Sequence, residues 1–109
     1  MTQYAFEMTL HPGADAEYIR LHDPVPNEIL EQLAAAGISD YSIFINDGRV
    51  FGAYRCTDLD RARAALAHDA SPEWSAAVIA LIAHRDSDPD FPMLRLPRIF
   101  RFDGGTASP

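Results

Sequence analysis

The sequence predicts an α+β domain with the ferredoxin-like split βαβ arrangement, a four-stranded antiparallel sheet with helices on one face. Two observations support this class. Strand-like and helix-like segments follow one another in the order β-α(α)-β-β-α(α)-β, and an Asp-Gly turn joins the two middle strands. The 109 residues are enough for one domain. We expect that domain over residues 1–103, and a flexible tail over the Gly/Ser/Pro-rich residues 104–109.

The first part of the chain is typical of a strand followed by two short helices. Residues 4–10 place apolar side chains at every second position, which is the period of a half-buried strand, and a Pro-Gly pair ends it. Helices are expected over residues 14–22 and 26–36. Two prolines between them interrupt the helical pattern and redirect the backbone.

A hairpin follows, and then a second series of helices and a strand. Tyr41, Ile43 and Ile45 share one face of an expected strand. That strand turns back at residues 46–49, which contain the Asp-Gly pair favoured in tight hairpins. The further expected elements are strands over residues 38–45 and 50–57, helices over 59–67 and 71–82, a polar loop over 84–92 and a last strand over 94–102.

The composition argues against several classes of protein. The net charge is −7 and the nine basic residues are all scattered arginines, so the basic patches that nucleic acids require are not expected. The single cysteine, Cys56, falls on an expected strand, which predicts a buried and unpaired thiol. No stretch approaches the roughly 20 apolar residues of a membrane span, and residues 1–10 lack a signal-peptide pattern. We expect a cytoplasmic protein with no nucleic-acid or membrane partner.

One face of the expected sheet lacks a cover within the chain. The helices can shield a single face, yet apolar residues occur on both faces of the strand over residues 38–45, where Phe44 stands between Ile43 and Ile45. We infer that the sheet of a second copy packs on the remaining face. The sequence therefore predicts a homodimer.

Tyr18 and His22 are the first candidates for chemistry. They stand four residues apart on an expected helix, which places them on one face, one turn apart. An imidazole can gain or lose a proton near neutral pH, and a tyrosine offers a flat apolar ring with one hydroxyl. From the spacing alone, a surface histidine that favours a helix C-terminus through the helix dipole is the more common explanation.

Trp74 allows two interpretations, and metal binding is not expected. The tryptophan can anchor its helix in the core or form a stacking surface for a sugar ring. No histidine shares a metal-ligand spacing with Cys, Asp or Glu, and the acidic residues at 86, 88 and 90 lack the glycine and glutamate of a calcium-binding loop. Gly-rich phosphate loops and nucleophile elbows are also missing from the sequence.

Two segments resemble the L-rhamnose mutarotase family. Residues Glu17 to Pro24 resemble its EYxRxHxP signature, and residues Ala36 to Phe44 resemble its AGIxxYSIF-like strand. The similarity extends over roughly residues 3–102 with similar spacing. The resemblance implies a dimeric α+β barrel with a pocket on the inner face of each sheet. It also implies an aldose 1-epimerase that interconverts the α and β anomers of a 6-deoxyhexose, L-rhamnose, by general acid–base catalysis.

The resemblance further assigns roles to individual residues. His22 matches the family's proton donor, whereas Tyr18, Tyr41 and the position pair beginning at Trp74 match residues that contact the sugar. The second position of that pair is Ser75, which we include as a sugar contact. The family uses no metal or cofactor, and none is expected here.

Departures from the family pattern leave other functions open. Pro26-Asn27 replaces a Trp-Pro pair, and Ser75 replaces a second tryptophan, so stacking on the sugar is expected to be looser. The alternatives are a mutarotase for another sugar such as L-fucose, or a non-catalytic sugar-binding or assembly module. A third hypothesis is a small monooxygenase or haem-handling protein of the same fold, with His22 or His84 as an axial ligand.

Overall fold

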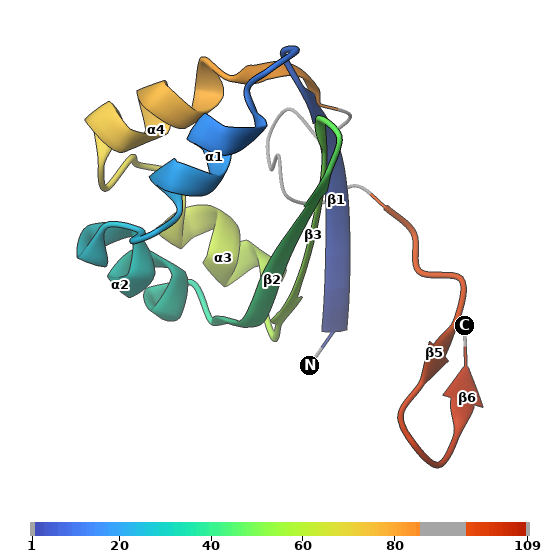
Figure 1. Ribbon diagram of the computed structural model, residues 1–109. Coiled ribbons are helices and arrows are strands. Elements are labelled where there is room, and N and C mark those ends of the chain that lie inside the picture. The colour runs from blue at the N-terminus through green and yellow to red at the C-terminus, as the bar shows by residue number, and fades with distance from the viewer. Residues whose placement is uncertain (1, 86–95, 109) are drawn as a thin grey trace.

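The computed structural model describes residues 2–85 and 96–108. A sheet with a layer of four helices on one side forms the body of the molecule, and a small hairpin stands away from it (Figure 1). The elements in chain order are β1 (Thr2–Leu10), α1 (Asp15–Leu21), α2 (Asn27–Ala35), β2 (Ile38–Asn46), β3 (Arg49–Cys56), α3 (Leu59–Ala65), α4 (Pro72–Ile79), β4 (Ile82–Arg85), β5 (Arg101–Phe102) and β6 (Ala107–Ser108).

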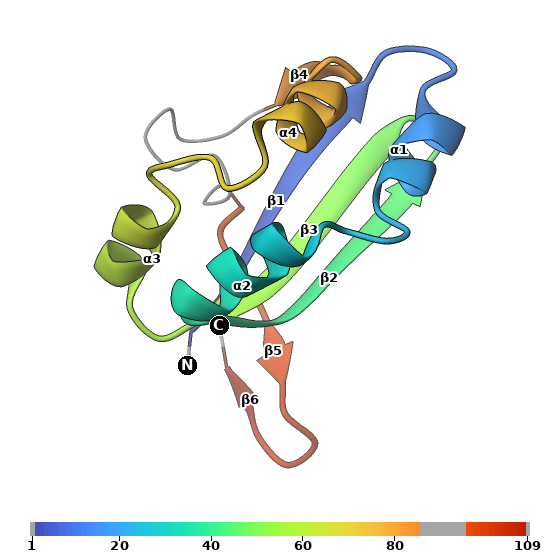
Figure 2. The same cartoon turned by 90° about the vertical axis from the view of Figure 1, so that its left-hand side faces the viewer.

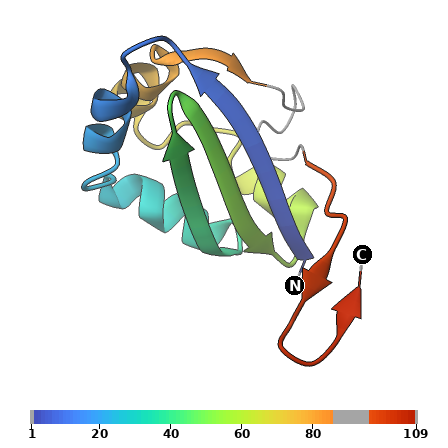
Figure 3. The ribbon, with the colours of Figure 1, turned by 45° about the vertical axis from the view of Figure 1, so that its right-hand side comes forward.

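The main sheet has four antiparallel strands in the order β2-β3-β1-β4, which confirms the ferredoxin-like prediction. The two central strands, β1 and β3, pair from Thr2 opposite Cys56 to Thr9 opposite Arg49. The β2–β3 hairpin turns at Asp47 and Gly48, which both have positive φ angles, as the predicted turn requires. Among the helices of the described residues, none covers the second face of these strands, which faces the viewer in Figure 3.

The helical layer covers the other face of the sheet (Figure 2). The carboxylate of Asp58 accepts hydrogen bonds from the backbone N–H groups of Asp60 and Arg61, which caps the start of α3. Pro72 occupies the first turn of α4, where its missing N–H costs nothing. In the part of the chain that the structure describes, no helix is long and apolar enough to cross a membrane.

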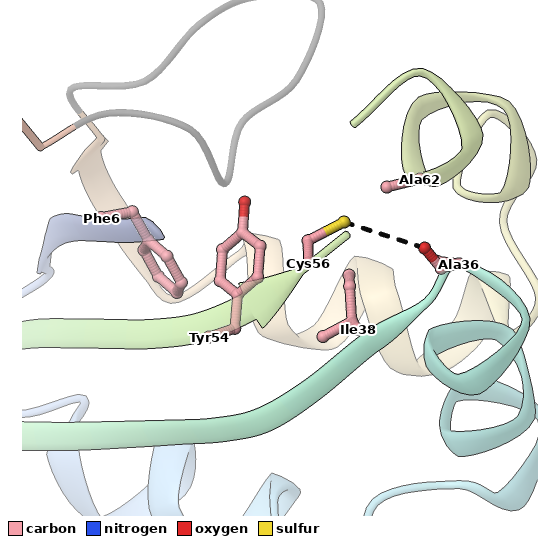
Figure 4. Packing of buried hydrophobic residues seen from close by; sticks show 6 residues of the cluster. All are labelled: Phe6, Ala36, Ile38, Tyr54, Cys56 and Ala62. Atoms are coloured by element: carbon pink, nitrogen blue, oxygen red, sulfur yellow. Dashed lines mark hydrogen bonds between the residues drawn. The ribbon is translucent and has the colours of Figure 1, made fainter. Parts of the chain in front are cut away.

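The core lies between the sheet and the helices in two clusters. The first joins β1, β2 and β3 to the end of α2 and to α3, and consists of Phe6, Ala36, Ile38, Tyr54, Cys56 and Ala62 (Figure 4). Cys56 is buried and free, as predicted, and its thiol lies 4.0 Å from the carbonyl oxygen of Ala36. The second cluster packs α1 onto the sheet and consists of Leu10, Ala14, Tyr18 and Val50.

A bulge in β2 determines which way Tyr41 faces. Ser39 pairs with Arg55 and Ser42 pairs with Ala53, so Asp40 and Tyr41 together oppose a single residue of β3. Asp40 has a φ of 48°, the left-handed conformation of the first residue in such a bulge. The extra residue turns Tyr41 toward the helices, on the same side as the buried Ile38.

The prediction for the last strand was wrong. The fourth strand is Ile82–Arg85, so α4 ends at Ile79 and His84, expected in a loop, lies within β4. Apolar residues at helical spacing continue past the true helix end, and no Gly or Pro marks the boundary. Of the expected strand over residues 94–102, Leu96 makes one bridge to Ala5. The remainder of the predicted loop and the start of that strand lie outside the described residues.

The chain ends in the β5–β6 hairpin. Arg101 pairs with Ser108 and Phe102 pairs with Ala107. The carboxylate of Asp103 accepts hydrogen bonds from the backbone N–H groups of Gly105 and Thr106 and from the hydroxyl of Thr106, which closes the turn. The expected flexibility of residues 104–109 stays a prediction.

Candidate functional site

A groove opens between the helical layer and strand β2. Its larger part, which we call the apolar recess, is a cavity of about 400 Å³. This volume lies within the range of roughly 300–1,000 Å³ that is typical of small-molecule sites. Its apolar wall is formed by Val25, Ile29, Leu30, Leu33, Ile43 and Leu66. The recess is also lined by His22, Gln32, Tyr41 and Trp74.

A second recess of about 380 Å³ continues the groove. It shares His22 and Tyr41 with the apolar recess, so the two are parts of one groove. We call it the polar recess because Tyr18 and Asp23 bring a hydroxyl and a carboxylate to its wall. The groove therefore has an apolar end and an end that adds Tyr18 and Asp23 to the shared His22 and Tyr41.

His22 occupies the boundary between the two recesses. It is the C-cap residue of α1, and its Nδ1 lies 2.7 Å from the carbonyl oxygen of Tyr18. Because a carbonyl oxygen only accepts hydrogen bonds, Nδ1 carries a proton, and Nε2 is the nitrogen left to exchange a proton with a ligand. The rings of Tyr18 and His22 are 4.4 Å apart, which confirms that the four-residue spacing places them on one face.

Trp74 anchors its helix, as one of its two interpretations predicted, and its role as a stacking surface for a sugar ring stays a prediction. Its indole N–H donates a hydrogen bond of 2.6 Å to the carbonyl oxygen of Leu21, which docks α4 onto the end of α1. Its ring stands edge-on to His22 at 5.3 Å and lines the apolar recess. The indole N–H is thus used within the protein, and the ring is what Trp74 offers to a ligand.

Tyr18 and Tyr41 contribute neutral phenols to the groove. Burial raises the pKa of Tyr18 to about 12. Burial also raises the pKa of Tyr41, and the neighbouring Tyr18 adds to that shift. Both hydroxyls therefore remain protonated at physiological pH, where they can donate and accept hydrogen bonds but do not act as anionic bases.

Ser75 lies apart from these residues. Its hydroxyl donates a hydrogen bond of 2.9 Å to the carboxylate of Asp69, and the residue lines a neighbouring recess with His68. Neither recess that contains His22 includes Ser75. Its role as a sugar contact stays a prediction, whereas Tyr18, His22, Tyr41 and Trp74 are brought together.

Sequence reasoning missed several groove residues. Ile43 could have been found, because it shares the alternating face with Tyr41. Val25 and Asp23 lie in the segment that leaves α1, which carries no periodic pattern. Gln32 also lines the groove, and its side-chain amide donates hydrogen bonds to the carbonyl oxygens of Ala65 and His68 at the end of α3.

Metal ligation finds no support among the described residues. Within residues 2–85 and 96–108, no group of three or more His, Cys, Asp or Glu side chains is arranged to hold a metal ion. The acidic residues at 86, 88 and 90 lie outside the described residues.

The fold and the groove together define a ferredoxin-like α+β protein with a groove of a size typical of small-molecule sites. The family model of L-rhamnose mutarotase matches residues 3–102. This match covers nearly the whole chain, and the chain therefore belongs to the L-rhamnose mutarotase family.

Individual relatives agree with this assignment. The L-rhamnose mutarotase of Acidiphilium cryptum (strain JF-5) is 38% identical over 92% of this chain and 97% of its own length. That of Sinorhizobium medicae (strain WSM419) is 36% identical over 82% and 88%. The crystal structure of an L-rhamnose mutarotase from Formosa agariphila superimposes with a TM-score of 0.68 at 24% identity, covering 94% of this chain and 100% of that one, and supports the fold.

Proposed function

We propose that this protein is an aldose 1-epimerase that interconverts the α and β anomers of a 6-deoxyhexose, with L-rhamnose as its substrate. The observation that carries the proposal is the placement of His22, whose Nδ1 is held by the Tyr18 carbonyl at the boundary between the apolar and polar recesses. The names of the 36–38% identical relatives support the choice of sugar.

The reaction needs proton transfer at two oxygens of the sugar. A proton is delivered to the ring oxygen while another leaves the anomeric hydroxyl, and the C1–O5 bond breaks to give the open aldehyde. Rotation about C1–C2 followed by ring closure produces the other anomer. In this scheme protonated His22 is the acid that delivers the proton from Nε2 to the ring oxygen.

The remaining groove residues bind and orient the sugar. The neutral hydroxyls of Tyr18 and Tyr41 pair with sugar hydroxyls, and the ring of Trp74 stacks on the C–H face. The apolar recess accepts the methyl group of a 6-deoxy sugar. A 6-hydroxyl placed there would lose its hydrogen bonds to water without replacement, which disfavours ordinary hexoses.

The open face of the sheet supports the proposal of a homodimer. Phe44 is 65% exposed and Phe51 is 37% exposed on that face. Ile99, which is 86% exposed, and Phe100 are further exposed apolar residues, in the segment between Leu96 and the β5–β6 hairpin. Exposed apolar patches of this kind mark interaction sites. Sedimentation should give a dimer for wild type and a monomer for Phe44→Glu; a monomeric wild type would contradict the dimer.

We further propose a cytoplasmic location. The single thiol, Cys56, is free and buried, a state that a reducing compartment preserves. Fractionation of expressing cells checks this proposal, since recovery of the protein outside the cytoplasmic fraction would contradict it.

Saturation-transfer NMR of anomer exchange tests the enzymatic proposal, with L-rhamnose, L-fucose and L-mannose as candidate substrates. The key variant is His22→Asn, because the asparagine amide retains a donor to the Tyr18 carbonyl but cannot transfer protons. We expect wild type to accelerate exchange of L-rhamnose most, and His22→Asn to lose about 10²–10⁴-fold. His11→Asn makes the same chemical change at an exposed turn and should stay active.

Two outcomes would contradict the proposal. Failure of wild type to accelerate the exchange of any of the three sugars would remove the enzymatic function. Full activity in His22→Asn would remove His22 as the proton donor.

A further inference from the structure

His22 has one nitrogen available for proton transfer with a ligand, since its Nδ1 is engaged by the carbonyl oxygen of Tyr18. Ring opening, however, needs one group that gives a proton and another that takes one. A single Nε2 cannot do both in the same step. The groove therefore needs a second group.

Besides Tyr18, His22 and Tyr41, the polar recess is lined by a carboxylic acid residue, Asp23. In the described part of the chain, four titratable side chains line the two recesses: Tyr18, His22, Asp23 and Tyr41. Burial raises the pKa of both tyrosines, which keeps them as neutral phenols and makes them poor proton acceptors. Asp23 is the remaining candidate for a base.

The position of Asp23 keeps its carboxylate available. The residue follows the C-cap His22 directly, and its backbone N–H donates to the carbonyl oxygen of Arg20 at 3.2 Å, which fixes the backbone beside the groove. Across residues 2–85 and 96–108, no hydrogen-bond or ion-pair partner engages its carboxylate. The nearby Arg20 pairs instead with Glu17 on the exposed side of α1.

We propose that Asp23 is the base that accepts the proton of the anomeric hydroxyl while His22 protonates the ring oxygen. This inference rests on the proposed mutarotase function. As the C1–O5 bond breaks, the O1–H proton moves to the Asp23 carboxylate and the Nε2 proton moves to O5. On closure O5 returns its proton to Nε2 and Asp23 returns its proton to O1, so both residues recover their starting states.

The test compares Asp23→Asn with Asp23→Glu in the anomer-exchange assay. We expect kcat of Asp23→Asn to fall about 10²-fold or more with KM nearly unchanged, because the amide preserves shape but cannot accept the proton. Asp23→Glu should recover part of the rate. Asp47→Asn is the matched control, since it removes an exposed carboxylate at a hairpin turn where asparagine is equally favoured.

The pH–rate profile separates a proton-transfer role from a structural one. The titratable groups around Asp23 are Tyr18 and His22 from α1 and Tyr41 from β2, with the Arg20–Glu17 pair on the outer side of α1. If the Asp23 carboxylate takes part in proton transfer, the shape of the pH–rate profile should differ between wild type and Asp23→Asn, whereas a purely structural role would leave the shape unchanged.

Three results would overturn the inference. If wild type is active and Asp23→Asn keeps the wild-type rate, Asp23 is not the base, and the proposed function stays intact. A raised KM with unchanged kcat would assign Asp23 to binding rather than to proton transfer. An inert wild type would overturn the proposed function and this inference with it.

Discussion

The indole N–H of Trp74 donates a hydrogen bond of 2.6 Å to the carbonyl oxygen of Leu21, the last residue of α1. The two residues are 53 positions apart in the chain, and this contact joins α4 to the helix that carries the proposed catalytic histidine. Since His22 follows Leu21 and also contacts the Trp74 ring, one side chain fixes both the helix end and the imidazole.

Trp74→Phe removes this hydrogen bond but preserves an aromatic wall. We expect the free energy of unfolding to fall by about 1 kcal/mol, because the Leu21 carbonyl loses its donor. The exchange rate should also fall severalfold as the end of α1 loosens around His22. Urea unfolding followed by circular dichroism, together with the anomer-exchange assay, measures both effects.

Ser75→Ala provides the comparison for Trp74→Phe. Ser75 lies outside the recesses that contain His22, so we expect its removal to leave the exchange rate unchanged. A large loss of rate in Ser75→Ala would instead support its predicted sugar contact. Unchanged stability and rate in Trp74→Phe would show that the indole N–H does not position His22.

Gly52→Ala should strongly destabilise the sheet. Gly52 is the cross-strand partner of Phe6, and a Cβ at position 52 would overlap the Phe6 ring in the first core cluster. Overpacking of this kind costs about 1–3 kcal/mol. Denaturant unfolding measures the loss. Introduced into Phe6→Leu, Gly52→Ala should lower the free energy of unfolding by less than it does in wild type, because the smaller leucine leaves room for the new Cβ. Additive losses in the double variant would contradict the proposed overlap.

Local sequence signals were sufficient for most of the fold. The apolar alternation in β1 and β2 and the Asp47-Gly48 turn depend on neighbouring residues, so the strands and their hairpin could be predicted. The boundary between α4 and β4 could not, because apolar residues continue from Val78 through Ile82 without a breaker. There the pairing of β4 with β1 determines the structure.

Only the part of the candidate site that depends on local geometry could be predicted from the residues themselves. Tyr18 and His22 are one helical turn apart, so their proximity follows from local geometry. Trp74 and Tyr41 reach the groove through tertiary packing, and it was the family resemblance that associated them with His22. Asp23 lines the polar recess from a segment without periodicity, which gives no signal in the sequence.

Asp40 should tolerate glycine but not valine. Its φ of 48° places it in the left-handed region, which glycine adopts freely and β-branched residues avoid. We expect Asp40→Val to lose about 1–2 kcal/mol of stability and to impair exchange, because the bulge that turns Tyr41 toward the groove is disturbed.

Asp40→Gly is the matched control for this backbone effect. It removes the exposed ion pair with Arg55, which is 3.5 Å long and contributes at most about 1 kcal/mol. Stability and exchange rates near those of wild type are therefore expected. Equal losses in both variants would show that the carboxylate matters more than the backbone conformation.

The buried tyrosines predict loss of stability in alkaline solution. Burial raises the pKa of Tyr18 from 10.0 to about 12, and it raises the pKa values of Tyr41 and Tyr54 as well. A folded-state pKa above the unfolded value means that the stabilisation is complete below pH 10 and is lost as the pH rises through 12. For Tyr18 the two-unit shift corresponds to about 3 kcal/mol.

Circular dichroism and tyrosinate absorbance, recorded together between pH 10 and 12, test this expectation. Ionisation of the buried tyrosines should coincide with unfolding, because the folded state excludes the phenolate. Tyr18→Phe removes one such group and should move the alkaline midpoint to higher pH. Full ionisation near pH 10 in a protein that stays folded would contradict the burial of these phenols, since a solvated hydroxyl keeps its ordinary pKa.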